Sequence, residues 1–171
     1  MRSDGQEQRY LEAAAEFGPA LDRLARGYEA DPDLRRDLRQ DIHVQLWRSL
    51  ARFDGRCSLR TWVYRVAHNV AATHVLKHKA KAPLVGLDEI EDAQGHDDPE
   101  AVAGERHAIE RLHALIRALK PPDSQIMLLY LEGFDAAAIG EVTALSAGAV
   151  AVKIHRIKAL LTQRFHQGRT P

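Results

Sequence analysis

Residues 58–69 read Ser-Leu-Arg-Thr-Trp-Val-Tyr-Arg-Val-Ala-His-Asn, and this stretch decides the fold. No glycine or proline interrupts it. Its apolar residues predict one buried face of a helix over residues 59–79, because they recur at positions i, i+4, i+7 and i+11. A loop with an Asp-Gly turn signal, residues 53–58, comes before it. The predicted buried face is Leu59, Val63, Val66 and Val70.

The other faces of this predicted helix carry residue types that hold unpaired bases. Such bases are held by stacking on aromatic or guanidinium planes, while Arg and Lys hold the nucleic-acid backbone. Thr61, Arg65 and Asn69 share one face beside the loop and could form a pocket for one flipped base. The alternative is that Trp62 and Tyr64 are core aromatics, which this segment taken alone favours. The candidate single-strand contacts are Arg56, Arg60, Thr61, Trp62, Tyr64, Arg65 and Asn69.

Two helices are predicted before the loop. Residues 8–29 form the first, and the Asp-Pro-Asp break at residues 31–33 starts the second, with proline near its first turn. Apolar side chains recur every four residues in the second helix, residues 34–50, and Trp47 widens the stripe. The candidate core positions are Leu11, Phe17, Leu21 and Leu24 in the first helix, and Leu34, Leu38, Ile42 and Leu46 in the second.

Helical periodicity fails between residues 83 and 105, where prolines and glycines punctuate an acidic stretch. Residues 1–82 carry 15 Lys+Arg and 11 Asp+Glu, residues 83–105 carry none and 8, and residues 106–171 carry 9 and 5. Two mildly basic blocks around an acidic strip suit two nucleic-acid-facing domains, although charge runs are more often solvated surface. We therefore expect an all-α chain of two small helical domains, residues 1–82 and 106–171, joined by an acidic linker at residues 83–105.

The second block is predicted to hold four helices. Residues 105–119 and 122–132 form the first two, and Gly133 ends the second at a left-handed position. Asp135 caps a short helix to residue 142, and Ser146 caps a last helix to residue 165. The apolar positions are Ile109, Leu112, Leu115, Ile116 and Leu119 in the first of these helices, and Val150, Ile154, Ile157 and Leu161 in the last.

The last two helices have the outline of a helix-turn-helix motif. In this motif the second helix presents its N-terminal residues to base edges in the major groove, and basic residues hold phosphates. The hydroxyl of Ser146 could also bond a phosphate at the helix N-terminus. The alternative is an ordinary helical hairpin whose exposed basic residues are solvated. The candidate duplex contacts are Ser146, Gly148, Lys153, His155, Arg156 and Lys158.

The motifs of the chain resemble those of the extracytoplasmic-function (ECF) group of sigma-70 family factors, in the family's order and spacing. Residues 37–42 with 46–47 resemble the helix that docks on the clamp helices of RNA polymerase. Residues 53–55 and 58–69 resemble the adjoining −10 recognition segment. The second domain of the family reads the −35 element. Segments that resemble it are residues 119–122, 128–134, 139–142 and 146–156.

This resemblance implies a non-enzymatic factor that directs core RNA polymerase to promoters, aids DNA melting and is held inactive by an anti-sigma factor. It also implies that the acidic linker threads the polymerase toward the RNA exit path. The implied clamp contacts are Asp37, Gln40, Asp41 and Gln45. The implied −10 contacts are Arg60, Thr61, Tyr64, Arg65 and Asn69, and the implied −35 contacts are Gly148, Lys153, His155 and Arg156.

The sequence departs from the family pattern at three places. His43 stands where the family usually has a bulky apolar residue. The turn at residues 143–145 lacks the usual glycine. The family more often has hydroxyl and basic side chains at the positions of Ala149, Ala151 and Val152. These changes remove hydrogen-bonding groups from the predicted recognition helix and favour weak or shape-based −35 readout.

Two other classes of function were weighed. A stand-alone helix-turn-helix regulator would leave residues 37–47 and 62–69 unexplained. A metal enzyme could use His74 and His78, which are spaced i, i+4, but no third ligand is evident. No phosphate-binding glycine loop, nucleophile elbow or cysteine cluster is present, so neither cofactor nor metal is expected.

Location is predicted from the same composition. Cys57 is the single cysteine, which excludes an internal disulfide and fits a reducing compartment. The N-terminal residues are polar, and no apolar run approaches the roughly 18 residues of a membrane span. We therefore expect a cytoplasmic protein without membrane insertion.

Overall fold

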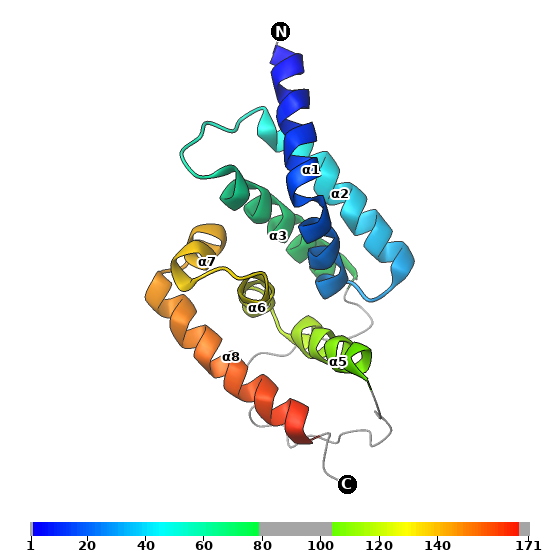
Figure 1. Ribbon diagram of the computed structural model, residues 1–171, viewed down its shortest axis with the longest axis vertical. Coiled ribbons are helices and arrows are strands. Elements are labelled where there is room, and N and C mark those ends of the chain that lie inside the picture. Colours follow the sequence, from blue (N-terminus) through cyan, green and yellow to red (C-terminus); the bar gives the residue numbers. More distant parts are fainter. Residues whose placement is uncertain (1, 79–103, 168–171) are drawn as a thin grey trace. The chain divides into compact units, whose positions relative to one another are not determined.

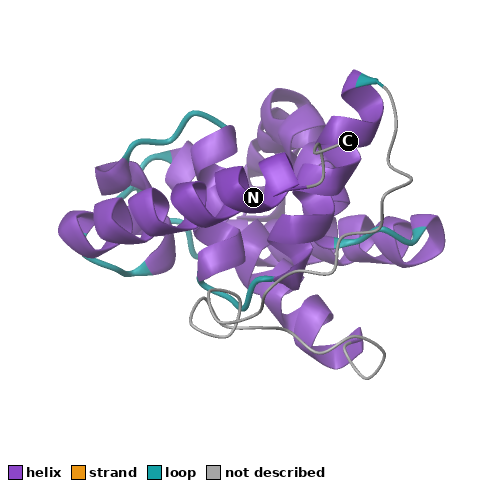
Figure 2. Ribbon diagram, turned by 90° about the horizontal axis from the view of Figure 1, so that it is seen from below, coloured by secondary structure: helices purple, strands orange, loops and turns teal. Residues whose placement is uncertain are grey.

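Figure 1 shows a computed structural model that describes residues 2–78 and 104–167. The described residues form helices joined by short loops and contain no strand, as Figure 2 also shows, so the all-α prediction is confirmed. The predicted linker lies outside the described residues except for its last two positions. The helices are α1 (Arg2–Tyr28), α2 (Pro32–Leu50), α3 (Leu59–His78), α5 (Glu105–Ala118), α6 (Asp123–Leu131), α7 (Ala136–Thr143) and α8 (Ala147–Gln167).

The chain divides into two compact units, which are described separately. The first comprises Met1–Lys81 with the short stretch Glu141–Ala144, and the second comprises Ala82–Gly140 with Leu145–Pro171. No single helix within residues 2–78 and 104–167 is long and apolar enough to cross a membrane. α7 and α8 meet that criterion only as a pair, and the pair is bent by 106°.

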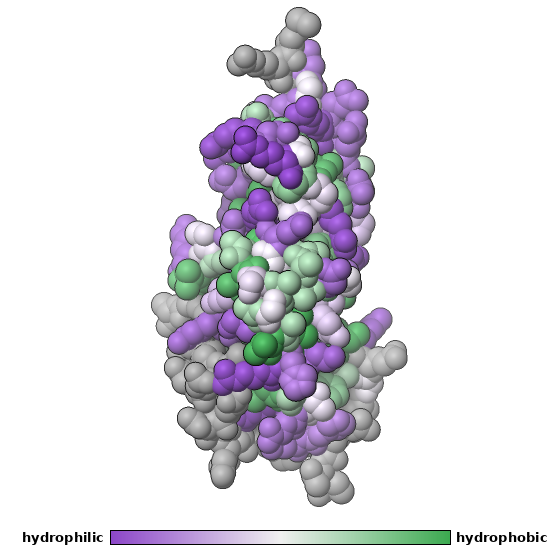
Figure 3. Space-filling model, turned by 90° about the vertical axis from the view of Figure 1, so that its left-hand side faces the viewer, coloured by the Kyte–Doolittle hydropathy of each residue, from purple (hydrophilic) through white to green (hydrophobic). Residues whose placement is uncertain are grey.

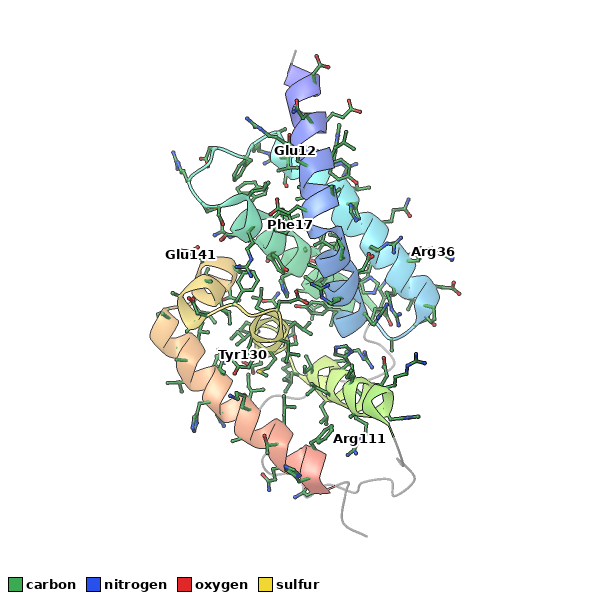
Figure 4. The ribbon with its side chains drawn as sticks, in the orientation of Figure 1. Glu12, Phe17, Arg36, Arg111, Tyr130 and Glu141 are labelled. Atoms are coloured by element: carbon green, nitrogen blue, oxygen red, sulfur yellow. The ribbon has the colours of Figure 1, made fainter. Side chains whose placement is uncertain are left out.

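The core of the first unit lies among α1, α2 and α3. Asp31 caps α2, because its side chain accepts hydrogen bonds from the backbone of Asp33 (2.9 Å) and Leu34 (3.0 Å). The helix starts at Pro32, two residues before the predicted start. Figure 4 shows Phe17 directed from α1 toward α3. The buried apolar side chains are Phe17, Leu21, Leu24 and Tyr28 of α1, Leu38, Ile42, Leu46 and Leu50 of α2, and Val63, Tyr64, Ala67 and Ala71 of α3.

Two predicted core positions of this unit are exposed. Leu11 is 58% exposed, because it lies on the outer side of α1. Trp47 is 42% exposed, so it does not widen the buried stripe of α2. Only the side chains of the four-residue repeat in α2 point into the core, so the outer face of this helix is available to a partner.

The buried face of α3 is rotated from the predicted one. Val63 is buried as expected, but Leu59, Val66 and Val70 are only half-buried. The buried positions are instead Val63, Tyr64, Ala67, His68, Ala71 and His74. Small residues let α3 approach α1 closely, and its aromatic and histidine rings fill the remaining space between the two helices.

The second unit packs α5, α6 and α8 around a separate core. Gly133 ends α6 with φ +84°, and Asp135 Oδ1 accepts from Ala138 N (2.8 Å) to cap α7; both features were predicted. Ile109 is 52% exposed and Ile154 is half-buried, which corrects their assignment to the core. Arg111 extends from α5 (Figure 4), and its Cζ atom lies 5.1 Å from the centroid of the Phe165 ring on α8. The largest fully buried side chains here are Ile116, Leu119, Ile126, Leu129, Ile139 and Ile157.

The turn between α7 and α8 is tight and depends on two small residues. The 106° bend is typical of a helix-turn-helix. A Cβ on Gly140 would lie 2.5 Å from the Leu145 carbonyl oxygen, so α7 can approach the turn only with glycine there. Ala144 takes the left-handed conformation at φ +61°, within the turn that lacks the glycine expected from the resemblance. An L-residue with a Cβ pays about 1 kcal/mol for that conformation.

We predict that Ala144→Gly raises the free energy of unfolding by about 0.5–1 kcal/mol, because the left-handed strain it removes exceeds the added entropy of the unfolded chain. Gly140→Ala is the matched opposite, and we expect it to lower stability by about 1–3 kcal/mol through the contact with Leu145. Urea unfolding of the two variants measures both changes. Equal stability of Ala144→Gly and the parent would show that the turn is not strained.

Candidate nucleic-acid interface

The loop between α2 and α3 is ordered by its own side chains. Asp54 accepts from Arg56 N (3.1 Å) through Oδ1 and pairs with Arg56 Nε (3.0 Å) through Oδ2. Gly55 has φ +76°, which confirms the predicted Asp-Gly turn. Ser58 Oγ accepts from Thr61 N (3.1 Å) and donates to Thr61 Oγ1 (3.0 Å), which caps α3. The loop therefore presents an exposed guanidinium, that of Arg56, beside the start of α3.

Trp62 fastens this loop to the end of α2. Its indole N–H donates to Ser49 Oγ (3.0 Å), and its ring meets the Phe53 ring edge-on with centroids 5.4 Å apart. Trp62 is nevertheless only half-buried. Trp62 therefore anchors the loop as a partly buried aromatic residue and keeps part of its surface accessible, while its contact with DNA stays a prediction.

Tyr64 and Thr61, two of the candidate single-strand contacts, are buried in the structure. The Tyr64 side chain is 3% exposed, packs edge-on against Phe17 and stacks on His68. A buried ring offers no face to a base, so the core alternative holds for Tyr64. Thr61 is 5% exposed, and its hydroxyl takes part in the cap of α3. Both residues support the exposed side chains of α3 from within the core.

A groove with a volume of about 550 Å³ lies between α2 and α3. Asp41 and Gln45 line it from α2, and Asn69, Thr73 and Lys77 line it from α3. Asp41 and Gln45 were predicted to contact polymerase and Asn69 to contact DNA, and all three are exposed. The structure thus brings residues of two predicted contact groups to the walls of one groove. Arg60 is also exposed, and Arg65 is half-buried.

The outer face of α2 carries the remaining predicted clamp contacts. Asp37 and Gln40 are exposed on it, while Leu38 and Ile42 point into the core. Val44 (40% exposed) and Trp47 (42%) also lie at the surface of α2, and the sequence analysis did not assign them to a contact face. The available signal was helical spacing, since Val44 lies four residues and Trp47 seven residues after Gln40. The surface of α2 is therefore mixed polar and apolar, as partner-binding faces commonly are.

The histidines of the first unit are engaged within the protein. His43 Nδ1 lies 3.0 Å from Tyr10 Oη, which satisfies the ring at a position where the family has an apolar residue. His68 Nδ1 lies 2.6 Å from Tyr28 Oη, and burial lowers the pKa of His68 to about 3. His74 Nε2 lies 2.9 Å from Glu29 Oε2. Within residues 2–78 and 104–167, no group of three or more His, Cys, Asp or Glu side chains could hold a metal ion.

The start of α8 exposes small and apolar residues. Ser146 Oγ accepts from Ala149 N (3.2 Å), which confirms the predicted cap, and its hydroxyl proton stays available to another acceptor. Gly148, His155 and Arg156 are exposed, as the predicted duplex-contact role requires. Lys158 is exposed too. Its ammonium nitrogen donates to Tyr130 Oη (3.1 Å) and lies 5.1 Å from the centroid of the Tyr130 ring, on α6 (Figure 4).

Lys153 differs from the other predicted duplex contacts. Its ammonium lies 2.8 Å from Asp123 Oδ1, and the side chains are 35% and 11% exposed, respectively. Asp123 begins α6, so the ion pair joins α6 to α8 within the second unit. The charge of Lys153 thus balances a nearly buried carboxylate, and its contact with duplex DNA stays a prediction.

Comparisons with known proteins agree with this geometry. The family model "Sigma-70 region 2" matches residues 14–81, and the model "Sigma-70, region 4" matches residues 109–161. The ECF RNA polymerase sigma-E factor of Haemophilus influenzae is 26% identical over 141 residues, which cover 75% of this chain and 72% of that protein. The structure of CnrH in complex with the cytosolic domain of CnrY has the same fold, with a TM-score of 0.68 at 20% identity over 97% of this chain and 93% of CnrH.

A three-helix region 2 followed by a region 4 with a helix-turn-helix defines a transcription initiation factor. The chain belongs to the ECF group of the sigma-70 family, whose members bind core RNA polymerase and direct it to promoter DNA. The resemblance drawn from the sequence is confirmed. A stand-alone regulator is not favoured, because it leaves the match to region 2 without a role.

We predict that the stability of the first unit falls as the pH falls from about 6.5 toward 3. The unfolded chain protonates His68 near its ordinary pKa of 6.5, whereas the folded chain does so only near 3, so acid favours the unfolded state. The slope reaches at most about 1.4 kcal/mol per pH unit. His68→Gln should flatten the curve relative to the parent in urea unfolding between pH 7 and 4. Parallel curves would mean that His68 is accessible to protons when folded.

We predict that Lys153→Gln lowers the free energy of unfolding by about 1–2 kcal/mol, because it leaves the Asp123 carboxylate without its cation. The affinity of the holoenzyme for duplex promoter DNA should keep its dependence on salt concentration, measured as the slope of log affinity against log salt. The Lys153 ammonium, held by Asp123, releases no counterion from DNA. Arg156→Gln is the comparison, and we expect it to flatten that slope by about 0.9. A flattened slope for Lys153→Gln would restore this residue to the duplex contacts.

Proposed function

We propose that the two domains divide promoter recognition between them. Residues 1–82 dock on the polymerase clamp and capture the unpaired −10 strand. Residues 106–171 bind the −35 duplex, and the acidic segment at residues 83–105 connects the two. The observation that carries the proposal is the groove between α2 and α3, where Asp41 and Gln45 face Asn69. A clamp bound on α2 would lie next to a strand bound on α3, so docking and strand capture support each other.

Strand capture rests on five side chains of the loop and of α3. Arg56, Arg60 and Arg65 supply guanidinium groups for the sugar-phosphate backbone and for stacking, and Asn69 supplies an amide that can bond a base edge. Trp62 contributes the accessible part of its ring and holds the loop in place. Because the loop is fixed by its own turn and cap, little ordering entropy is lost when a base enters.

Clamp docking rests on the exposed face of α2. Asp37, Gln40, Asp41 and Gln45 supply carboxylate and amide groups suited to a basic and polar partner surface. Val44 and Trp47 add exposed apolar area, and a partly exposed Trp is typical of residues on which binding energy concentrates. Four buried Leu and Ile residues on the opposite side hold this face rigid.

Duplex binding rests on α8 with the start of α7. His155, Arg156 and Lys158 can hold phosphates along one side of the major groove, and the cap Ser146 can donate its hydroxyl proton to a phosphate. Gly148 has open space where a Cβ would be, so the fold itself does not require glycine there. The absence of a side chain permits close approach of the helix to the groove floor.

The protein is proposed to work without chemistry of its own. The polymerase supplies catalysis, and this chain supplies binding energy to one strand of the opened duplex. We place it in the cytoplasm, with core polymerase and DNA. Since CnrH is seen in complex with the cytosolic domain of CnrY, we also propose that a protein inhibitor, an anti-sigma factor, holds this chain when it is not on polymerase.

The function is tested by reconstitution with purified core RNA polymerase on a promoter library. The chain should bind core polymerase, and the complex should initiate at a defined set of promoters, while the chain alone binds promoter duplex poorly. Tight duplex binding by the chain alone, without affinity for core polymerase, would support a stand-alone regulator instead.

We predict that Asn69→Ala and Asp41→Ala separate the two activities of the first domain. Asn69→Ala should reduce promoter opening at least tenfold, measured by permanganate reactivity of unpaired thymines, with unchanged affinity for core polymerase. Asp41→Ala should weaken binding to core polymerase and leave opening intact at saturating concentration. Opening by Asn69→Ala at the parental level would remove that residue from the strand contacts.

A further inference from the structure

Val152 is an exposed branched side chain on the helix assigned to the −35 duplex. It is 68% exposed in the second turn of α8. Helical spacing puts Gly148, Val152 and His155 on one face, opposite the buried Val150 and Ile157. Figure 3 looks onto the side of the molecule where Figure 1 shows α7 and the start of α8, and the colours there are mostly pale green and white. The centre of the outward face is therefore apolar.

The position of Val152 matters more than its exposure, since single exposed apolar residues are ordinary on protein surfaces. Gly148, one turn earlier, would place a Cβ in open space, so nothing on that side keeps a partner away from the helix. His155 and Arg156, at the next turn, supply polar groups beside it. A partner that approaches this face thus meets the isopropyl group of Val152 between a bare backbone and polar side chains.

The major groove offers few apolar groups to such a side chain. Donor and acceptor patterns on base edges need hydrogen-bonding side chains, which Ala149, Ala151 and Val152 lack. The C5 methyl of thymine is the apolar feature of the groove, and contact with it distinguishes thymine from the other bases. Resting on the proposed function of α8, we propose that Val152 is a specificity-determining residue that contacts a thymine methyl group in the −35 element.

This proposal differs from purely shape-based readout. Readout by groove width or deformability depends on stacking and stiffness and does not require one methyl at one position. Contact with a methyl group removes about one CH₂ equivalent of apolar surface from water, which corresponds to about a fourfold change in affinity. Removal of one methyl group from the DNA can therefore distinguish methyl contact from shape-based readout.

The experiment uses holoenzyme reconstituted from the full chain and core polymerase. Promoters are first selected from duplexes randomised in the −35 region. Each thymine of the selected element is then replaced singly by deoxyuridine, which removes only the C5 methyl. We expect one or two positions at which the substitution weakens binding about fourfold, and little effect elsewhere. Replacing cytosine by 5-methylcytosine at such a position in a weaker promoter should strengthen binding similarly.

Protein variants assign the effect to the residue. Val152→Ser should abolish the difference between thymine and deoxyuridine at the sensitive position, and it should fold because the side chain is mostly in solvent. Ile109→Ser is the matched control, since Ile109 is an exposed branched residue (52%) on α5 of the same domain, and the difference should persist. Thermal melts of both variants confirm that each is folded at the assay temperature.

Three results would overturn the proposal. If deoxyuridine has no effect at any position, α8 does not read methyl groups. If the effect persists in Val152→Ser, another residue reads the methyl; in both cases holoenzyme binding remains and the proposed function stands. If the holoenzyme selects no −35 sequence and Arg156→Gln leaves upstream DNA binding unchanged, the assignment of α8 to the duplex fails, and this proposal fails with it.

Discussion

The packing of α3 on α1 fixes the rotation of α3 about its own axis, and the proposed strand-binding surface depends on that rotation. Tyr64 and His68 project into the core, where Tyr64 meets Phe17 and the His68 ring lies 2.6 Å from the Tyr28 hydroxyl. A hydrogen bond between buried groups is costly to lose and defines a single arrangement of the two helices. With those residues inside, Asn69 has to lie outside, while Arg60, one turn before Tyr64, is exposed because it stands at the start of α3. The arrangement of the core thus decides which polar side chains can reach DNA.

The second domain solves the same problem with an ion pair and a tight turn. Asp123 at the start of α6 holds Lys153 of α8, and Gly140 lets the end of α7 approach the turn closely. Both contacts constrain the direction in which α8 leaves the turn. The outward face of α8 is then Gly148, Val152 and His155, a surface poor in hydrogen-bonding groups. Under the proposed duplex role, sequence specificity would accordingly come from apolar contact or from DNA shape, because phosphate contacts position a protein without reading sequence.

Two departures from the family pattern have local compensation. His43 replaces an apolar residue on α2, and the Tyr10 hydroxyl of α1 satisfies its ring nitrogen at 3.0 Å. The turn at residues 143–145 lacks the glycine expected from the resemblance, and Ala144 adopts a left-handed conformation there. In the first case a polar pair substitutes for packing, and in the second the backbone accepts strain. The fold that these residues belong to is shared with CnrH at 20% identity.

The sequence by itself determined the helices, their ends and the kind of protein. Caps at Asp31, Asp135 and Ser146 and the left-handed Gly133 act within a few residues of their position, so local chemistry specifies them without reference to the rest of the chain. The run at residues 58–69 carried the family resemblance for the same reason. Only the tertiary structure decided that Tyr64 is buried while Trp62 stays partly accessible, and that Lys153 serves Asp123. A helical repeat leaves the buried face uncertain by about one residue, or 100° of rotation, and an ion pair between residues 30 positions apart has no signature in the local sequence.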